Sequence, residues 1–293
     1  MLTRSFIPGS EWAYFKIYTG TKSADHILIS MLPLLESMKN EGVIDRFFFI
    51  RYNDPNFHLR LRLHLCQNKN FTKLLSILFD YLENNFVKGL VWDVQWGTYN
   101  REVERYGKGY INIVESIFCI DSDVIIRILS LLNKNGDEAQ RWLVALLLID
   151  DLLSIANYDI TSKSLLLKEL SNSFTQEFGY TNYTYKKRLD SRYRDNKDVI
   201  FNVLNNRQEN PIQAYTNYFQ LRSTLLSPFV KRIVENYDNE ISLDSLFKSI
   251  VHMTMNRLFL SDNRLHEMVI YDFLSRYYTS TIARNYRVEK LKM

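Results

Sequence analysis

Residues 58–65 (HLRLRLHL) combine arginine and histidine at a spacing that suits a β-strand. Successive side chains of a strand point to opposite faces. The leucines would therefore occupy one face, and the other face would carry His58, Arg60, Arg62 and His64. Arginine holds a carboxylate or phosphate through two parallel hydrogen bonds, and a row of like charges needs acids or an anionic ligand beside it. The pattern predicts either an anion-binding face or the exposed polar face of a half-buried sheet.

A second basic group lies in residues 98–109 (TYNREVERYGKG). Arg101 and Arg105 are four residues apart and would share a face if the segment is helical, with the two intervening glutamates able to orient or neutralise them. Gly107 would end the turn and allow a close backbone approach. The alternative is a charged surface turn with internal ion pairs.

His252 lies within an apolar helical pattern, residues 249–260 (SIVHMTMNRLFL), and Asn256 follows one turn later on the same face. Imidazole exchanges protons near neutral pH, so His252 is a candidate general acid or base. The alternative is a core histidine with a satisfied hydrogen bond.

Residues 186–197 (KKRLDSRYRDNK) hold six basic and two acidic residues, and Tyr180, Tyr183, Tyr185 and Tyr193 lie in or beside them. Basic residues among aromatic ones can grip a peptide or RNA. A solvated loop is the interpretation that the charge density favours.

The elements that position these residues follow a clear order. Short aromatic or alternating segments predict strands at residues 12–18, 46–52, 58–65 and 91–99, and the turn at 53–56 joins two of them in a hairpin. Apolar stripes predict helices at 26–39 and 71–84, and then at 110–120, 122–132, 138–155, 161–178, 196–204, 211–237, 242–260 and 266–278. Strands followed by helices predict an α+β fold, with a mixed or antiparallel sheet from the first third packed with a largely helical remainder. We expect a single domain over residues 1–293, strand-rich at about 10–110 and helical at about 110–280.

The composition is that of a soluble globular protein, with 293 residues, 46% hydrophobic and 24% charged. A net charge of +4 is too small to indicate a general nucleic-acid binder. The longest apolar run, residues 142–149, is too short to cross a bilayer, and the amino terminus lacks an export signal, so we expect a cytoplasmic protein. HExxH, GxGxxG, GxxxxGK[ST] and GxSxG are all absent from the sequence, which leaves metalloprotease and nucleotide-binding functions without support.

Five segments, taken in order, resemble the thiopeptide-type bacteriocin biosynthesis domain, which is also the carboxy-terminal, glutamate-elimination domain of class I lantibiotic dehydratases. They are WAYFKIY, FFFIRYNDPNFHLRLRL, TYNREVERYGKG, ESIFCIDSD and HMTMNRL. The resemblance runs from about residue 10 to about residue 278, and FIRYxDPxxHLRLR is its specific part.

The resemblance implies an activity. In that family a glutamylation domain esterifies Ser or Thr of a precursor peptide with glutamate from glutamyl-tRNA, and the elimination domain expels the glutamate to leave dehydroalanine or dehydrobutyrine. The large glutamylation domain is missing from this sequence, so the chain looks like a split elimination subunit that needs a separate glutamylation partner. The resemblance also makes a homodimer plausible, and it implies no metal or organic cofactor.

The resemblance also implies site residues. The family's catalytic arginines fall on Arg60, Arg62 and either Arg101 or Arg105, and its catalytic histidine falls on His252. The candidate substrate-binding residues are His58, Tyr52, Asn256 and Arg257.

Two other functions remain open at this point. Thiopeptide pyridine synthases resemble the same domain but join two dehydroalanines in a formal [4+2] cycloaddition. The presence of both strand arginines and the helix histidine favours elimination, because a cycloaddition has no glutamate to hold. The other alternative is a non-catalytic subunit that only presents the precursor peptide to a partner.

Overall fold

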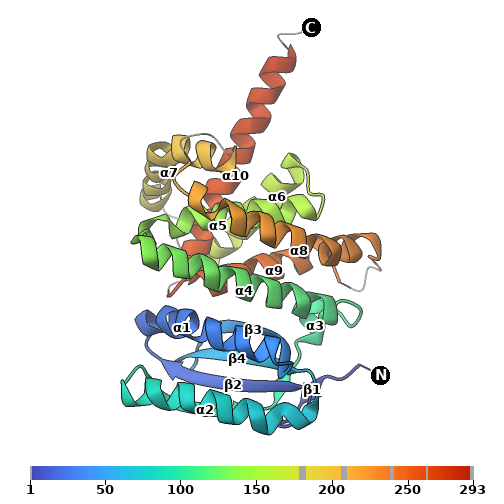
Figure 1. Cartoon of the computed structure of the whole chain (residues 1–293). Coiled ribbons are helices and arrows are strands. Elements are labelled where there is room, and N and C mark those ends of the chain that lie inside the picture. Colours follow the sequence, from blue (N-terminus) through green and yellow to red (C-terminus); the bar gives the residue numbers. More distant parts are fainter. Residues whose placement is uncertain (1, 178–182, 206–209, 238–240, 262, 291–293) are drawn as a thin grey trace. The chain divides into compact units, whose positions relative to one another are not determined.

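The computed structural model describes residues 2–177, 183–205, 210–237, 241–261 and 263–290 (Figure 1). The chain divides into two compact units. The first comprises Met1–Asn135, Asp238–Ile241 and Asn256–Ser261, and the second comprises Gly136–Tyr237, Ser242–Met255 and Asp262–Met293.

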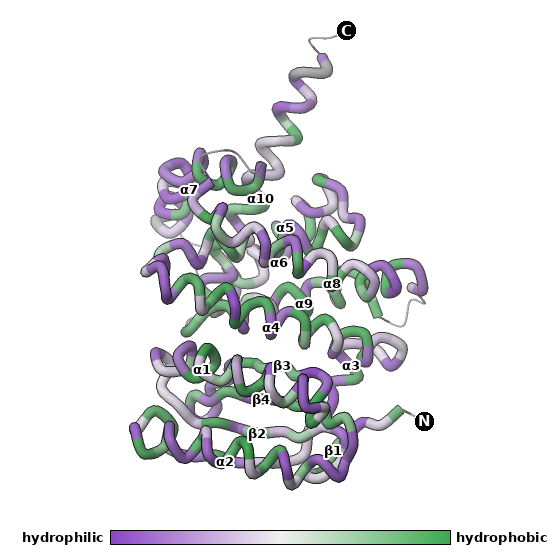
Figure 2. Tube along the Cα trace, viewed as in Figure 1, coloured by the Kyte–Doolittle hydropathy of each residue, from purple (hydrophilic) through white to green (hydrophobic). Residues whose placement is uncertain are grey.

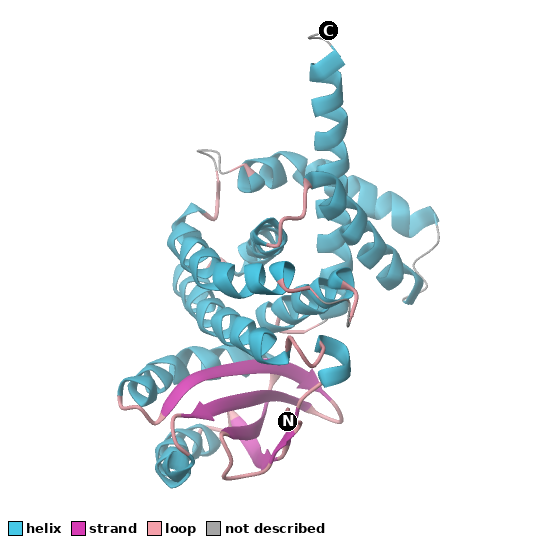
Figure 3. Ribbon diagram, turned by 90° about the vertical axis from the view of Figure 1, so that its right-hand side faces the viewer, coloured by secondary structure: helices cyan, strands magenta, loops and turns pink. Residues whose placement is uncertain are grey.

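The first unit is built on an antiparallel sheet with the strand order β3-β4-β2-β5, drawn in magenta in Figure 3. A second, two-stranded sheet pairs β1 with β6. The elements of this unit are β1 (Ser5–Phe6), β2 (Trp12–Thr19), α1 (Thr21–Asn40), β3 (Ile44–Asn53), β4 (Phe57–Leu65), α2 (Phe71–Val87), β5 (Val91–Gly97), β6 (Tyr99–Asn100), α3 (Val103–Tyr106) and α4 (Ile111–Asn135).

Helices α1 and α2 cover the leucine face of the sheet. The leucines of β4 are at most 2% exposed, and β3 residues of the same face contact α1. Arg51 pairs with Asp25, and the Lys39 ammonium lies 4.7 Å from the ring centre of Phe47. From α2, the ring of Phe71 lies 5.4 Å from that of Trp96 on β5. The opposite face of the sheet, with the basic residues of β4, is therefore turned away from these two helices.

The outer edge of β3 is closed by the side chains of Ser122 and Asn256, two residues of the first unit. The Ser122 hydroxyl of α4 accepts a hydrogen bond from the Phe49 N–H at 3.1 Å. The Asn256 amide makes two further bonds, accepting from the Arg51 N–H at 2.9 Å and donating to the Arg51 carbonyl at 2.8 Å. Backbone groups that an edge strand would otherwise leave unpaired are satisfied in this way.

The second unit is helical. Its helices are α5 (Arg141–Ile155), α6 (Ile160–Glu177), α7 (Tyr183–Leu204), α8 (Thr216–Glu235), α9 (Leu243–Leu258) and α10 (Asn263–Lys290), and the last three residues of α9 belong to the first unit. Helix α5 is apolar on nearly all sides because it is the buried centre of this unit.

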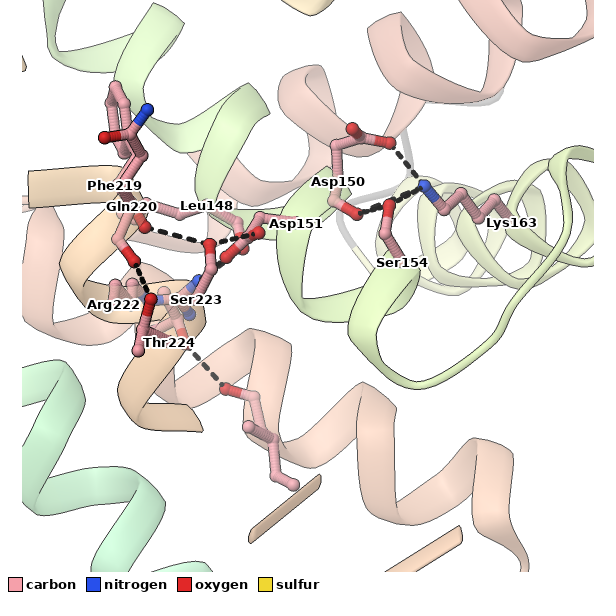
Figure 4. Close-up of polar contacts among 12 residues, drawn as sticks. Leu148, Asp150, Asp151, Ser154, Lys163, Phe219, Gln220, Arg222, Ser223 and Thr224 are labelled. Atoms are coloured by element: carbon pink, nitrogen blue, oxygen red, sulfur yellow. Dashed lines mark hydrogen bonds and ion pairs between the residues drawn. The ribbon is translucent and has the colours of Figure 1, made fainter. Parts of the chain in front are cut away.

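Two polar networks join α5 to its neighbours, and Figure 4 shows both. The Lys163 ammonium, from α6, donates to the Asp150 carboxylate and the Ser154 hydroxyl, each at 2.5 Å. Arg222 of α8 is fully buried and donates to the Leu148 carbonyl at 3.0 Å. Because each buried cation has hydrogen-bonding partners, these groups hold the helices together without leaving an uncompensated charge.

The α+β class expected from the sequence is confirmed, and every sheet pairing is antiparallel. The single-domain expectation stays a prediction. The predicted break between two helices at residue 121 is wrong, because α4 runs without interruption through Asp121 and Ser122. Both side chains are fully buried, and Ser122 is held by hydrogen bonds to β3 and Arg257.

The solvated loop expected at residues 186–197 is also wrong, because the segment lies within α7. Figure 2 shows α7 as mostly hydrophilic. The buried side chains at helical spacing are Leu189, Ile200 and Val203. Three apolar residues are too few to reveal a helical pattern in so charged a segment. Tyr180, from the same predicted cluster, lies outside the described residues.

Along the described ranges, no helix combines the length and the apolar character that crossing a bilayer requires. The cysteines are both free, with Cys66 exposed and Cys119 buried.

Candidate functional site

Arg62 lies at the centre of an aromatic cage on the basic face of the sheet. Its guanidinium carbon is 4.9 Å from the ring centre of Tyr14 on β2, 4.9 Å from that of Phe48 on β3 and 4.8 Å from that of Tyr99 on β6. The residue is 7% exposed, and its buried Nε has no hydrogen-bond partner among the described residues. Its Nη1 donates a long hydrogen bond, of 3.4 Å, to the Arg60 carbonyl. An exposed polar face, the alternative interpretation of this strand, is therefore wrong for Arg62.

Arg60 is oriented by two neighbours on the same face. Its Nε donates to His58 Nε2 at 3.1 Å, and its guanidinium carbon lies 3.3 Å from the ring centre of Tyr52. His58 is fully buried, and its Nδ1 lies 2.8 Å from the Asn56 carbonyl. Because Nδ1 donates to a carbonyl and Nε2 accepts from an arginine, the hydrogen bonds assign a neutral imidazole.

Electrostatics agree with this assignment. Burial lowers the pKa of His58, and the charges of Arg60 and Lys16 lower it further, while the bond to Asn56 and the charge of Asp54 act in the other direction. Burial also raises the pKa of the neighbouring Tyr14, although the charges of Arg62 and Arg60 act to lower it. Arg60 and Arg62, with Lys16 opposite Arg60 on the neighbouring strand, therefore lie among neutral aromatic and imidazole groups.

What distinguishes Arg60 and Arg62, which we call the strand arginines, is the lack of a counter-ion. Within the described part of the chain, neither forms an ion pair with a carboxylate. Other arginines of the unit differ, because Arg51 pairs with Asp25, and Arg101 pairs with Glu115. A buried cation without a counter-ion is costly, so the arrangement suits an anionic ligand.

The two arginines near α3 have different surroundings. Arg101 is bound in a bidentate pair with Glu115, at 2.7 Å from Nε and 2.6 Å from Nη2, and the Tyr99 hydroxyl donates to the same carboxylate. The side chain of Arg105 is 38% exposed and lies 3.4 Å from Glu102. Gly107 ends α3 with a φ of 78°, in agreement with the turn that the sequence predicts there.

Asn256 and Arg257 bond to β3 and to α4, respectively. Asn256 bonds to the backbone of β3, as described above. Arg257 is fully buried, with Nε donating to the Ser122 hydroxyl at 3.1 Å and its guanidinium carbon 4.4 Å from the ring centre of Phe118. Burial lowers its pKa to about 10, and the charge of Arg62 acts in the same direction.

In the second unit, His252 forms a dyad with a carboxylate that sequence reasoning missed. Nδ1 of His252 lies 2.8 and 3.0 Å from the two carboxylate oxygens of Glu267, and the Tyr271 hydroxyl donates to Glu267 at 3.0 Å. Glu267 is fully buried, whereas the His252 side chain is 27% exposed. The signal in the sequence was an acid at position 267 near the start of α10, directly before the apolar residues 268–270 and four residues before Tyr271. A histidine that donates from Nδ1 to a carboxylate presents the lone pair of Nε2 outward, which is the form of a general base.

Among the described residues, His, Cys, Asp and Glu side chains form no group of three or more that could hold a metal ion.

Comparison with known proteins identifies the family. Residues 12–278 match the family model described as "lantibiotic biosynthesis dehydratase C-term". The chain belongs to this family. The resemblance to the carboxy-terminal domain of lantibiotic dehydratases is therefore confirmed.

Two curated relatives support the membership. Nisin biosynthesis protein NisB of Lactococcus lactis subsp. lactis is 28% identical over 284 residues, which cover 94% of this chain and 26% of NisB. Subtilin biosynthesis protein SpaB of Bacillus subtilis is 22% identical over 273 residues, which cover 90% of this chain and 25% of SpaB. The chain thus spans about a quarter of the length of the lantibiotic biosynthesis proteins that it matches.

Three solved structures share the fold of this lantibiotic dehydratase family member. The tRNA-dependent lantibiotic dehydratase MibB from Microbispora sp. 107891 matches with a TM-score of 0.73 and 22% identity, over 94% of this chain and 29% of MibB. TsrL matches with a TM-score of 0.63 and 14% identity, over 92% of this chain and 95% of TsrL. The pyridine synthase TbtD from thiomuracin biosynthesis matches with a TM-score of 0.59 and 10% identity, over 92% of this chain and 98% of TbtD.

Proposed function

We propose that this chain eliminates glutamate from glutamylated Ser or Thr residues of a ribosomally made precursor peptide. A base removes the Cα proton, the Cβ–O bond breaks, a Cα=Cβ double bond forms, and glutamate leaves as its carboxylate. The product is dehydroalanine from Ser and dehydrobutyrine from Thr. A separate glutamylation subunit would supply the ester in the cytoplasm, where glutamyl-tRNA is available.

The observation that carries the proposal is the pair of strand arginines without a counter-ion. A glutamyl ester keeps the side-chain carboxylate of glutamate free, and a planar guanidinium binds a carboxylate through two parallel hydrogen bonds. Among the described residues, the buried Nε of Arg62 has no acceptor, and the surrounding rings leave the side chain only 7% exposed, so an anionic acceptor gains more there than it would in water. Membership in the dehydratase family supports the same substrate chemistry.

We assign proton removal to His252, with Glu267 as the residue that positions it. The Glu267 carboxylate fixes Nδ1 as the protonated nitrogen and stabilises the imidazolium that forms when Nε2 takes the proton. His58 is not assigned this role, because both of its ring nitrogens are already engaged in hydrogen bonds.

We assign the third catalytic arginine to Arg105 in preference to Arg101. The charge of Arg101 is compensated by Glu115 in a buried bidentate pair, whereas Arg105 is part-exposed and can reach a substrate carbonyl. A cation there stabilises the enolate-like charge that develops during proton removal. His58 and Tyr52 position Arg60, and Asn256 and Arg257 support the site from behind.

The fold is also that of the pyridine synthase TbtD, so a [4+2] cycloaddition is the second candidate activity. A cycloaddition substrate carries no glutamate, and it would give the strand arginines no carboxylate to hold. A non-catalytic, peptide-presenting subunit is the third candidate, and it would have no use for the His252–Glu267 dyad.

One experiment separates elimination from the other two candidates. A peptide carrying a glutamylated serine is incubated with the chain and analysed by mass spectrometry, in parallel with Arg60→Ala and His252→Ala variants. Elimination predicts loss of glutamate and a new alkene with the unaltered chain, and intact glutamylated peptide with either variant. Unchanged ester in all samples would contradict the proposal, and unchanged ester together with peptide binding that Arg60→Ala weakens would favour a presenting subunit.

A further inference from the structure

Helices α7 and α10 enclose a groove in the second unit that the proposed elimination does not use. Its volume is about 270 Å³. The floor is apolar and is formed by Leu189, Leu265, Met268 and Val269, while Arg188 and Arg192 stand at the rim. The two arginines are one helical turn apart on α7, so both face the same side of the groove.

The segment of α7 that carries the two rim arginines is strongly basic. Residues 186–197 contain six basic and two acidic side chains. One of the acids, Asp190, is already paired with Arg276 at 2.6 Å. Arg188 and Arg192 are exposed, and no carboxylate among the described residues forms an ion pair with either. An apolar floor beneath two cations complements a segment with apolar anchors and acidic flanks.

The lining favours a peptide over RNA as the occupant. Nucleic-acid strands are held by aromatic side chains on which bases can stack. Of the α7 tyrosines, Tyr185 lines the groove, with its hydroxyl 3.5 Å from the Met268 sulfur, whereas the Tyr193 ring packs 5.7 Å from the Phe273 ring and is not part of the lining. A single lining ring offers no row of aromatic side chains for successive bases. The remaining floor is aliphatic or thioether surface, which suits Leu-like or Met-like anchors.

We propose that the α7–α10 groove is a docking site for an acidic segment with apolar anchors, carried by the peptide substrate outside its reacting residues. The identification of this segment with the substrate rests on the proposed function, whereas the binding chemistry does not. Docking at a distance from the reacting residue raises the local concentration of substrate without changing the chemical step.

The first test measures binding by fluorescence anisotropy. The probe is a labelled synthetic peptide of about 14 residues, with leucines at helical spacing and glutamates at the remaining positions. We expect the Arg188→Glu/Arg192→Glu variant to bind it about tenfold more weakly than the unaltered chain at moderate salt. The matched control is Lys187→Glu/Arg194→Glu, which changes the net charge of α7 equally at exposed positions outside the groove lining and should change affinity by about twofold at most. Leu265→Ser, which removes part of the floor, should also weaken binding.

Equal loss in the two charge-reversal variants would overturn the proposal, because binding would then follow net charge. Failure of the unaltered chain to bind the probe would overturn it as well. Tighter binding of a single-stranded RNA of the same length, with displacement of the peptide, would assign the surface to nucleic acid.

The second test links the groove to the substrate. With a glutamylated peptide that carries the acidic segment, Arg188→Glu/Arg192→Glu should raise KM about tenfold and leave kcat unchanged. With a short glutamylated peptide lacking the segment, the variant should match the unaltered chain. Probe binding without any elimination would contradict the proposed function and support the docking site. Elimination with an unchanged KM in Arg188→Glu/Arg192→Glu would contradict the docking site alone.

Discussion

At the scale of single residues, the central feature is a buried guanidinium whose environment is incomplete. Arg62 gains cation–π contacts from three rings, but these do not satisfy its Nε donor. An unsatisfied buried donor costs about 1–3 kcal/mol, and more when the group is charged. A bound carboxylate would accept from this donor and remove the penalty, and the free energy gained would strengthen binding.

Replacing Arg62 by lysine tests this feature because lysine keeps the charge and loses the planar fork. We expect Arg62→Lys to lower kcat/KM for a glutamylated peptide roughly 100-fold. The control is Arg46→Lys at the other end of the same face, where the side chain is 39% exposed and lies 3.9 Å from Asp45. Wild-type rates in Arg62→Lys would show that bidentate recognition is not used.

A pH-dependent contribution to stability is expected from His58. Because its pKa is lowered in the folded chain, the unfolded chain binds a proton more readily below about pH 6.5, and the free energy of unfolding falls as the pH drops. His58→Phe removes this titration and keeps a flat ring between Tyr18 and Tyr52. Denaturant unfolding at about pH 7 and about pH 5 should show a smaller loss of stability in His58→Phe than in the unaltered chain. An equal loss in both would argue against a neutral, buried His58.

The dyad predicts coupling between two residues. We expect Glu267→Gln to lower kcat about 100-fold, because the amide keeps the volume and loses the charge that stabilises the imidazolium. In a His252→Ala background the same change should have almost no further effect, because residues that act as a unit are non-additive. Fully additive losses in the double variant would show that Glu267 acts on folding alone.

At the scale of elements, strand β3 depends on side chains for its outer edge. Asn256→Leu removes two hydrogen bonds to the Arg51 backbone and leaves both backbone groups without their partner. We expect a loss of about 2 kcal/mol in the free energy of unfolding. Asn256→Asp, which keeps the acceptor and loses the donor, should cost about half as much, and an unchanged denaturation midpoint in Asn256→Leu would contradict the role.

Strand β4 shows what sequence pattern can predict about an element. Its period-two alternation locates both faces correctly, because leucines at every second position leave little choice of register. Burial of the basic face could not be predicted, since it depends on Tyr14, Phe48 and Tyr99, which come from three other strands. The Glu267 partner of His252 escapes prediction for the same reason, because the two residues meet through packing of α9 against α10.

Some helices are located correctly from the sequence, and others are not. The apolar stripes of α1, α2 and α6 locate these helices within a few residues, because each buries one face. The sequence predicts two helices where α4 is continuous, since Asp121 and Ser122 resemble a break until their tertiary partners are known. It predicts a loop at the basic stretch of α7, because charge patterning alone does not separate a solvated helix from a solvated loop.

At the scale of the whole molecule, the family match fixes the fold while the chemistry depends on a few residues. Solved relatives with 10 to 22% identity share the fold, and one of them is a pyridine synthase. A fold that serves different reactions leaves the substrate to be decided by the groups in the site. The first unit contributes the two strand arginines, which pair with no carboxylate among the described residues, and the second unit contributes a histidine held by a buried carboxylate.

The most direct measurement compares two leaving groups on the same peptide serine, a glutamyl ester and a glutaminyl ester. The esters have nearly the same size, and only the glutamyl ester offers a side-chain carboxylate to the strand arginines. We predict that the chain eliminates glutamate roughly 100-fold faster than glutamine, and that Arg60→Ala/Arg62→Ala abolishes the difference. Equal rates for the two esters in the unaltered chain, or no elimination of either, would contradict the account.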